Sequence, residues 1–195
     1  MGSLSFEIKA RCSDPSRIRK ILLARGACFK GLDRQVDTYF RVPSGWLKLR
    51  EGNIENALIY YKRADQKRSK KCEAVLFPCK KNSLLKKLLT VALGILIVVD
   101  KKREIYFIQN AKFHIDRVKH LGNFAEIEVF GRKGNVGEAK LREKCEFYQK
   151  LLGIRAQELV ADSYSDQLLK AGQRTTGNGE RLSLPIPRSP RCAIR

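Results

Sequence analysis

Two acidic residues near the C-terminal end of the folded part have the type and spacing of metal ligands. They lie in the segment Phe-Ala-Glu-Ile-Glu-Val-Phe at 124–130. In a strand, alternation places Glu126 and Glu128 on one face, about 7 Å apart, and Ile127 and Val129 on the other. Two carboxylates this close repel each other in a dry interior unless a cation lies between them. A divalent metal is the usual cation, so this strand predicts metal chemistry.

The first strand of the chain carries the same kind of pattern. In residues 5–11, Ser-Phe-Glu-Ile-Lys-Ala-Arg, alternation places Ser5, Glu7, Lys9 and Arg11 on one face. Further predicted strands repeat it. Their charged faces together hold Glu7, Lys9, Lys48, Arg50, Lys62 or Arg63, Lys101, Arg103, Lys112, His114, Asp116, Glu126 and Glu128. Basic residues outnumber acidic residues in this set.

Any one such strand is more often the solvent side of an ordinary half-buried antiparallel sheet. Recurrence over roughly eight strands instead favours a barrel with a polar lumen. Charges inside a lumen must be compensated, because uncompensated ions away from bulk water are costly. A triphosphate would supply the missing negative charge. The acids among the bases would then serve as ligands for Mg²⁺ or Mn²⁺, which prefer carboxylate and phosphate oxygens.

The elements that must position these residues follow from periodicity and turn residues. Helices are expected from the start signal at 13–15 to Gly26, and over 83–93, 137–152 and 165–171. Strands are expected over 5–11, 34–42, 46–51, 57–63, 72–77, 95–103, 104–109, 113–118 and 124–130. Short connections favour antiparallel pairing. The predicted fold class is α+β.

Length and net charge limit the number of domains and the kind of partner. The chain has 195 residues, 43% of them hydrophobic, which is enough for one domain over 1–170. Residues 171–195 carry five arginines and one glutamate without apolar periodicity, so a disordered basic tail is predicted. The net charge of +20 predicts a polyanionic partner, which is a nucleic acid, an anionic membrane or a phosphorylated small molecule.

Cysteine usage and hydropathy bear on zinc binding, on the cellular compartment and on membrane contact. The six cysteines form no Cys-x-x-Cys pair and the chain has two histidines, which argues against a zinc site. With no signal peptide, a reducing cytoplasmic compartment is predicted. The longest apolar run, 88–99, is too short to span a bilayer of roughly 30 Å as a helix, so no membrane partner is expected.

Several segments, taken in order, resemble one family. They are FEIKAR at 6–11, QVDTYF at 35–40, GWLKLRE at 45–51, LIYYKRAD at 58–65, VVDKKREIY at 98–106, HID at 114–116, LGNFAEIEV at 121–129 and SYSD at 163–166. The chain resembles the CYTH superfamily, the triphosphate tunnel metalloenzymes, and most closely the branch related to class IV adenylyl cyclases.

This resemblance implies an eight-stranded antiparallel closed β-barrel with flanking helices, whose tunnel holds a triphosphate. It implies phosphate contacts from Lys9, Lys48, Arg50, Lys62 or Arg63, Lys101, Arg103 and Lys112. It implies that Glu7, Asp116, Glu126 and Glu128 bind one or two Mg²⁺ or Mn²⁺ ions, and that Glu7, Lys9, Glu126 and Glu128 are the catalytic residues. His114 lies on the Asp116 face, where it would contact a metal ligand, contact the substrate, or serve as a structural histidine.

One departure from the family pattern bears on the metal. The opening signature is Glu-x-Glu-x-Lys, and Ser5 stands at its first position here. A serine hydroxyl is a weak metal ligand. The departure therefore bears on metal affinity and on catalysis.

The leading function is metal-dependent hydrolysis of a nucleoside, thiamine or inorganic triphosphate, because water needs no special positioning of a ribose. The first alternative is cyclisation of ATP to cyclic AMP and pyrophosphate. The second is a non-catalytic protein that binds a triphosphate or a nucleic acid, with nucleic acid the less favoured partner. The chain would act as a monomer or a homodimer.

Overall fold

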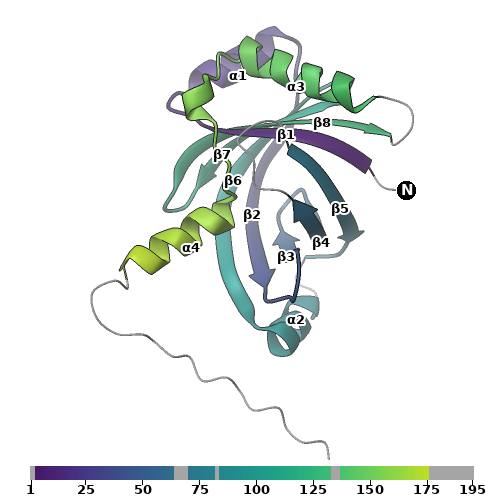
Figure 1. Cartoon of the computed structure of the whole chain (residues 1–195), viewed down its shortest axis with the longest axis vertical. Coiled ribbons are helices and arrows are strands. Elements are labelled where there is room, and N and C mark those ends of the chain that lie inside the picture. The colour runs from purple at the N-terminus through teal and green to yellow at the C-terminus, as the bar shows by residue number, and fades with distance from the viewer. Residues whose placement is uncertain (1–2, 64–69, 82–83, 133–136, 176–195) are drawn as a thin grey trace, which may run out of the picture.

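A computed structural model describes residues 3–63, 70–81, 84–132 and 137–175 (Figure 1). The fold is α+β, as the sequence predicts, with eight antiparallel strands and four α-helices in this part of the chain. The strands are β1 (Ser3–Arg11), β2 (Cys28–Phe40), β3 (Trp46–Glu51), β4 (Asn56–Arg63), β5 (Lys70–Pro78), β6 (Ile95–Ile108), β7 (Ala111–Val118) and β8 (Gly122–Arg132). The helices are α1 (Pro15–Ala24), α2 (Leu85–Leu93), α3 (Glu138–Leu151) and α4 (Tyr164–Thr175), with a 3₁₀ turn at Ala156–Glu158.

The eight strands form one strongly curled sheet. Its hydrogen-bonded order is β1-β5-β4-β3-β2-β6-β7-β8, and β8 pairs again with β1. The β1–β8 seam runs from Ser3↔Arg132 to Arg11↔Phe124, whereas β1 and β5 share only three register pairs, from Ser5↔Cys72 to Glu7↔Lys70. The ring of strands is therefore joined firmly along β8 and only over a short length along β5.

Alternation gives each strand one face toward the inside of the curl and one toward the outside. On β1, β7 and β8 the outer face is apolar, and α1 and α3 lie across it (Figure 1). The core between these layers contains Phe6, Ile8, Phe113, Ile127 and Val129, all nearly inaccessible. This packing fixes the register of the strands, and thereby aims their charged faces inward.

Local signals explain the helix boundaries. Asp14 caps α1 by accepting a hydrogen bond from the backbone N–H of Arg17, at 3.0 Å. The helix α2 ends at Gly94, whose φ of 70° favours glycine. Ser83, the first residue of the helix expected over 83–93, lies outside the described residues.

Three sequence expectations need correction. Residues 95–103 and 104–109 form the single long strand β6, because no turn residue separates Arg103 from Glu104. The second strand begins at Cys28 rather than at residue 34. The last helix continues to Thr175, inside the range 171–195 that was expected to be disordered. Residues 176–195, the rest of that tail, lie outside the described residues.

No helix in the described ranges has the length and apolar character that crossing a membrane requires.

Candidate functional site

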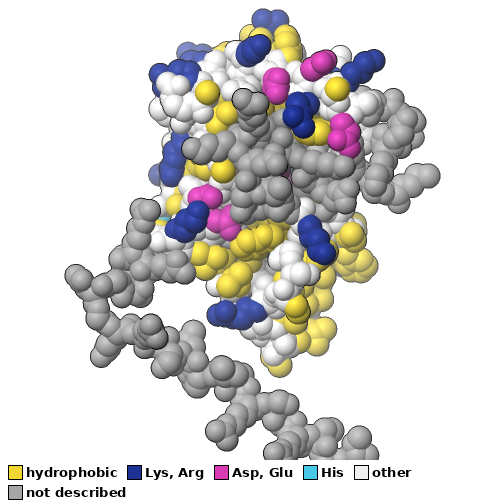
Figure 2. Space-filling model, viewed as in Figure 1, with side chains coloured by type: hydrophobic (Ala, Val, Ile, Leu, Met, Phe, Trp, Pro, Cys, Tyr) yellow, Lys and Arg dark blue, Asp and Glu magenta, His cyan; other side chains and the backbone are white. Residues whose placement is uncertain are grey.

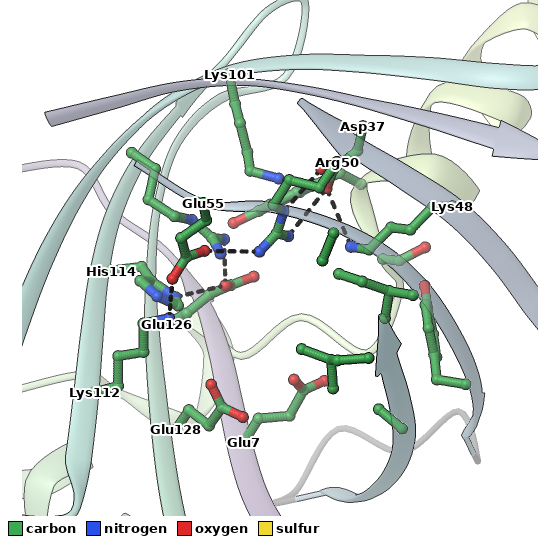
Figure 3. Close-up of a pocket in the computed structure, with 18 of the residues that line it drawn as sticks. Glu7, Asp37, Lys48, Arg50, Glu55, Lys101, Lys112, His114, Glu126 and Glu128 are labelled. Carbon is green, nitrogen blue, oxygen red and sulfur yellow. Dashed lines mark hydrogen bonds and ion pairs between the residues drawn. The ribbon is translucent and has the colours of Figure 1, made fainter. Parts of the chain in front are cut away.

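The inner faces of the strands enclose a cavity of about 480 Å³. Among the described residues, its wall contains six cationic side chains, Lys9, Lys48, Arg50, Lys101, Arg103 and Lys112, and five acidic ones, Glu7, Asp37, Glu55, Glu126 and Glu128 (Figure 3). The sequence led us to expect a larger excess of bases. The near balance means that most of these cations already have a protein partner.

Asp37 on β2 is the anionic centre for one half of the cationic wall. Its carboxylate lies 2.7 Å from Nζ of Lys101, 3.1 Å from Nζ of Lys48 and 2.9 Å from Nε of Arg50. Burial alone would raise the pKa of Asp37, but the charges of Arg50, Lys101 and Lys48 hold it well below its usual value. Three cations are thus held at one point of the cavity before any ligand arrives.

Lys101 is the cation most affected by enclosure. Its side chain is 2% exposed and is surrounded by other cations. Burial lowers the pKa of Lys101 to about 7, the positive charges of Arg103, Arg50 and Lys48 add to this effect, and Asp37 opposes it. The charge of this ammonium group therefore changes near neutral pH.

Glu126 on β8 organises the other half of the wall. Its carboxylate accepts from Arg103, lies 3.1 Å from Nζ of Lys9, and lies 3.2 Å from Nδ1 of His114. Burial would raise the pKa of Glu126, but Arg103, Lys9 and His114 hold it well below its usual value. Burial and the nearby Arg103 lower the pKa of His114 to about 4, so this imidazole is neutral at pH 7.

Arg103 is held from behind by Asp116. Both carboxylate oxygens of Asp116 accept from Arg103, and one also accepts from the Tyr164 hydroxyl at 2.8 Å. Tyr164 opens α4, where Ser163 and Asp166 form a reciprocal cap, with Asp166 Oδ2 accepting from the Ser163 backbone N–H at 2.9 Å. The Ser-Tyr-Ser-Asp segment therefore joins the last helix to the site.

Among the described residues of the wall, Glu7 and Glu128 are two acids that face each other. They are directly opposite in the β1–β8 register and lie together in Figure 3. No ion pair joins either of them to a cation of the described residues. Burial raises the pKa of Glu128, and the charge of Glu7 raises it further. Among the described side chains, this pair, rather than Glu126 with Glu128, is the one without a cation between the two carboxylates.

The two carboxylates of Glu7 and Glu128 are suitable ligands for a divalent cation. Mg²⁺ is commonly bound through one or two carboxylates with substrate phosphates completing its coordination. Within the described residues, no three histidine, cysteine or acidic side chains are grouped closely enough to hold a metal by themselves. A metal at Glu7 and Glu128 would therefore need oxygens from a ligand or from water.

Glu55 enters the cavity from the turn between β3 and β4. It accepts from Arg50 at 3.0 Å and from Lys112. The turn is held by Asp33, whose carboxylate accepts from the backbone N–H groups of Asn53, Ile54 and Glu55 at 2.7, 3.0 and 2.9 Å. Arg50 and Lys112 are therefore kept in place by an acid on a fixed turn.

One panel of the cavity carries no charge in its described part. It consists of three cross-strand pairs between β4 and β5, which are Ala57↔Pro78, Ile59↔Leu76 and Tyr61↔Ala74. Leu76 is 57% exposed although it lines the cavity, which shows that space is open in front of it. The cavity thus has a charged side and an apolar side.

Comparison with known proteins places the chain in a family. A model of the CYTH domain matches residues 4–164. The chain belongs to the CYTH domain family. No curated protein sequence matches it.

Solved structures show the same CYTH fold. The PH1012 protein of Pyrococcus horikoshii has 23% identity and a TM-score of 0.73, with 83% of this chain and 98% of that chain covered. A candidate adenylate cyclase from Vibrio parahaemolyticus has 18% identity and a TM-score of 0.70, with 87% and 99% covered. A candidate adenylyl cyclase from Hippeastrum with a dominant triphosphatase activity has 14% identity and a TM-score of 0.56, with 88% and 96% covered.

The CYTH fold brings most of the predicted residues to the cavity and leaves out Lys62 and Asp116. The wall contains Glu7, Lys9, Lys48, Arg50, Lys101, Arg103, Lys112, His114, Glu126 and Glu128. Lys62 is exposed, because strand parity turns Ala57, Ile59 and Tyr61 inward. The Arg63 side chain lies outside the described residues. Asp116 lies behind Arg103 rather than in the wall.

Sequence reasoning missed three groups of the CYTH site. Asp37 and Tyr39 share a strand face with Gln35, a polar alternation that could have revealed Asp37. Tyr164 precedes a recognisable cap at the start of α4, but its contact with Asp116 spans 48 positions. Glu55 lies in a loop, where no periodicity indicates which way a side chain points.

Proposed function

We propose that this protein is a divalent-metal-dependent enzyme that binds a triphosphate-containing compound in the cavity and hydrolyses it. One observation carries the proposal. Six cationic side chains and a pair of carboxylates that face each other converge on a single enclosed space. Nucleoside, thiamine and inorganic triphosphates all present the anionic group that such a space would take.

The charge of the wall supports a metal complex as the ligand rather than a bare polyanion. Five acids offset six cations in the described wall, so it cannot neutralise the several negative charges of a triphosphate. Divalent cations that enter with the phosphates would restore the balance. Enzymes of the CYTH family depend on divalent metals, and we propose either Mg²⁺ or Mn²⁺ here.

In the proposed site, Glu7 and Glu128 would hold the metal together with phosphate oxygens. A bound metal supplies charge neutralisation at the phosphoryl group and lowers the pKa of bound water. Glu126 is engaged by Lys9 and Arg103, so it joins the metal ligands only if those cations turn toward the phosphates. Asp116, which Arg103 and Tyr164 occupy, is left out of the proposed metal set.

The cationic residues would grip phosphate oxygens from fixed positions. Asp37 aims Lys48, Arg50 and Lys101, and Glu55 aims Arg50 and Lys112. A preorganised set of donors costs little reorganisation when charge develops during phosphoryl transfer. Lys62 is left out of the proposed phosphate contacts, because its side chain points away from the cavity.

Cyclisation of ATP is the second candidate function, and the uncharged β4–β5 panel favours keeping it. A nucleoside attached to the triphosphate could pack on Ile59, Tyr61 and Leu76, which would hold its ribose inside the cavity. A ribose held near the phosphates could compete with water as the attacking group.

The proposal is tested by product formation. ATP, thiamine triphosphate and inorganic triphosphate are each incubated with the protein and Mg²⁺ or Mn²⁺, while phosphate, pyrophosphate and cyclic AMP are followed. Phosphate release that a chelator abolishes supports hydrolysis. Cyclic AMP with pyrophosphate supports the cyclase. If no substrate gives a product but triphosphate stabilises the protein, the protein is a non-catalytic triphosphate binder. If there is neither product nor stabilisation by triphosphate, and RNA binds tightly, the protein is a nucleic-acid-binding protein.

A further inference from the structure

The segment from Ala74 to Val99 has a composition that the cavity does not explain. It contains four lysines, many aliphatic residues and no acidic residue. It includes the end of β5, all of α2 and the start of β6. In a chain where acids otherwise occur throughout the folded part, this stretch is both apolar and purely basic.

Helix α2 is apolar on most of its surface, yet none of its residues is fully buried. Its sequence is Leu-Lys-Lys-Leu-Leu-Thr-Val-Ala-Leu. Leu85, Leu89 and Leu93 are half-buried on one side. Helices that are apolar almost all round are normally buried. The structure therefore leaves a helix with a second apolar face that nothing in the described chain covers.

That second face is formed by Leu84, Leu88 and Val91. Their exposed fractions are 82%, 64% and 81%. The spacing i, i+4 and i+7 places the three side chains in one line along the helix. Figure 2 shows hydrophobic side chains gathered at this end of the molecule, where Figure 1 places α2. We call this line the α2 ridge.

The charges around the α2 ridge are positive. Lys87 lies beside it on the helix and is exposed, and Lys80 and Lys81 just before the helix are exposed as well. Arg41 packs next to Gly94 at the other end of the helix, where its backbone N–H donates to the Gly94 carbonyl at 3.2 Å. The nearby acid, Glu51, is already paired with Lys86 at 2.7 Å.

We propose that the α2 ridge docks on the surface of an anionic lipid bilayer. Apolar side chains in line with flanking lysines are the features of a helix that lies in the membrane interface. A second copy of the chain fits less well, because a two-fold contact here would place the lysines of one copy against those of the other. Such contact is peripheral, and is distinct from the spanning helix that the sequence excludes.

The proposal is tested by co-sedimentation of the full chain with vesicles. We expect binding to vesicles that contain phosphatidylserine, little binding to pure phosphatidylcholine, and weakening as salt is raised. The variant L84S/L88S/V91S keeps every lysine and should bind at least tenfold more weakly. The matched control L23S/F147S replaces two exposed apolar residues, 52% and 57% exposed, on α1 and α3, and should bind as the wild type does.

Tryptophan emission and the oligomeric state in solution test the same proposal by independent means. The variant L88W should show a blue-shifted tryptophan emission on addition of phosphatidylserine vesicles, because its indole would enter the interface. Absence of wild-type binding, or equal binding by the wild type and L84S/L88S/V91S, would overturn the proposal. A dimer in solution that L84S/L88S/V91S dissociates would also overturn it, and would assign the α2 ridge to a second copy. Vesicle binding, tryptophan emission and the oligomeric state can all be measured without turnover of a triphosphate, so they test this proposal separately from the proposed function.

Discussion

Asp37 shows how a single residue holds several cations together in the cavity. One carboxylate gathers Lys48, Arg50 and Lys101 inside the sheet, at distances of 2.7 to 3.1 Å. Without it, three cations would lie close together in a poorly solvated space. A phosphate group could replace the carboxylate as their common partner, because it offers the same kind of oxygens. In the ligand-free protein, the Asp37 carboxylate would therefore make the contacts that we propose for a phosphate group.

Replacing Asp37 by Asn should therefore destabilise the ligand-free protein strongly. Removing one partner of a buried charge cluster costs about 3–5 kcal/mol. Inorganic triphosphate should recover more stability in D37N than in the wild type. Urea unfolding with and without triphosphate measures both effects. The control E104Q removes a partly exposed ion pair with Arg19 and should cost less than about 1 kcal/mol. A loss in D37N as small as in E104Q would contradict this account.

Lys101 gives the pH dependence a definite sign. Its pKa in the folded protein is lowered to about 7, mainly by burial, so the free enzyme carries this charge below pH 7 and loses it above. The value of kcat/KM for a triphosphate should therefore fall as the pH rises through about 7, since kcat/KM reports the free enzyme. In K101R the guanidinium stays charged, and this fall should disappear. An unchanged pH profile in K101R would assign the ionisation to another group.

Ser5 allows a direct test of the departure from the family signature. It is buried and donates to Glu128, next to Glu7. S5E would add a third carboxylate beside Glu7 and Glu128, so the metal-free protein should be less stable than the wild type. Mg²⁺ should raise its melting temperature more than that of the wild type. Equal metal-induced shifts in the two proteins would show that residue 5 does not reach the metal.

At the scale of elements, strand alternation explains what the sequence could predict. It correctly placed Lys48 with Arg50, and Lys101 with Arg103, because each pair lies two positions apart on a charged face. It left the choice between Lys62 and Arg63 open; Lys62 is exposed, and the Arg63 side chain lies outside the described residues. It could not place Glu55, whose position depends on backbone contacts of Asp33 across about twenty residues of sequence.

The uncharged panel of β4 and β5 predicts a preference for organic triphosphates. L76S removes an apolar contact that is open to the cavity, so we expect kcat/KM for an organic triphosphate to fall about 3- to 10-fold. The value for inorganic triphosphate should stay the same, because it has no group that reaches the panel. F77S is the matched control, because strand parity turns Phe77, the residue next to Leu76, away from the cavity. Equal losses for both substrates would show that the panel does not contact the organic group.

At the scale of the whole molecule, the curled sheet brings distant strands to one space. The cavity wall draws on β1, β2, β3, β4, β5, β6, β7 and β8. The eight antiparallel strands and their helices followed from periodicity and from the family resemblance. The sequence analysis divides β6 into two strands between Arg103 and Glu104, whereas the structure has one continuous strand there. Pairing partners between strands depend on long-range packing, which local patterns do not contain.

The measurement that tests the central claim most directly is metal-dependent triphosphate turnover by E7Q/E128Q beside the wild type and E104Q. The proposed metal lies between Glu7 and Glu128, so the double variant should lose at least 100-fold in kcat/KM. It should keep its fold, because Gln is close in size and removes the repulsion. E104Q, on the outer face of β6, should retain wild-type turnover. Metal-dependent turnover by E7Q/E128Q at the wild-type rate would contradict the account.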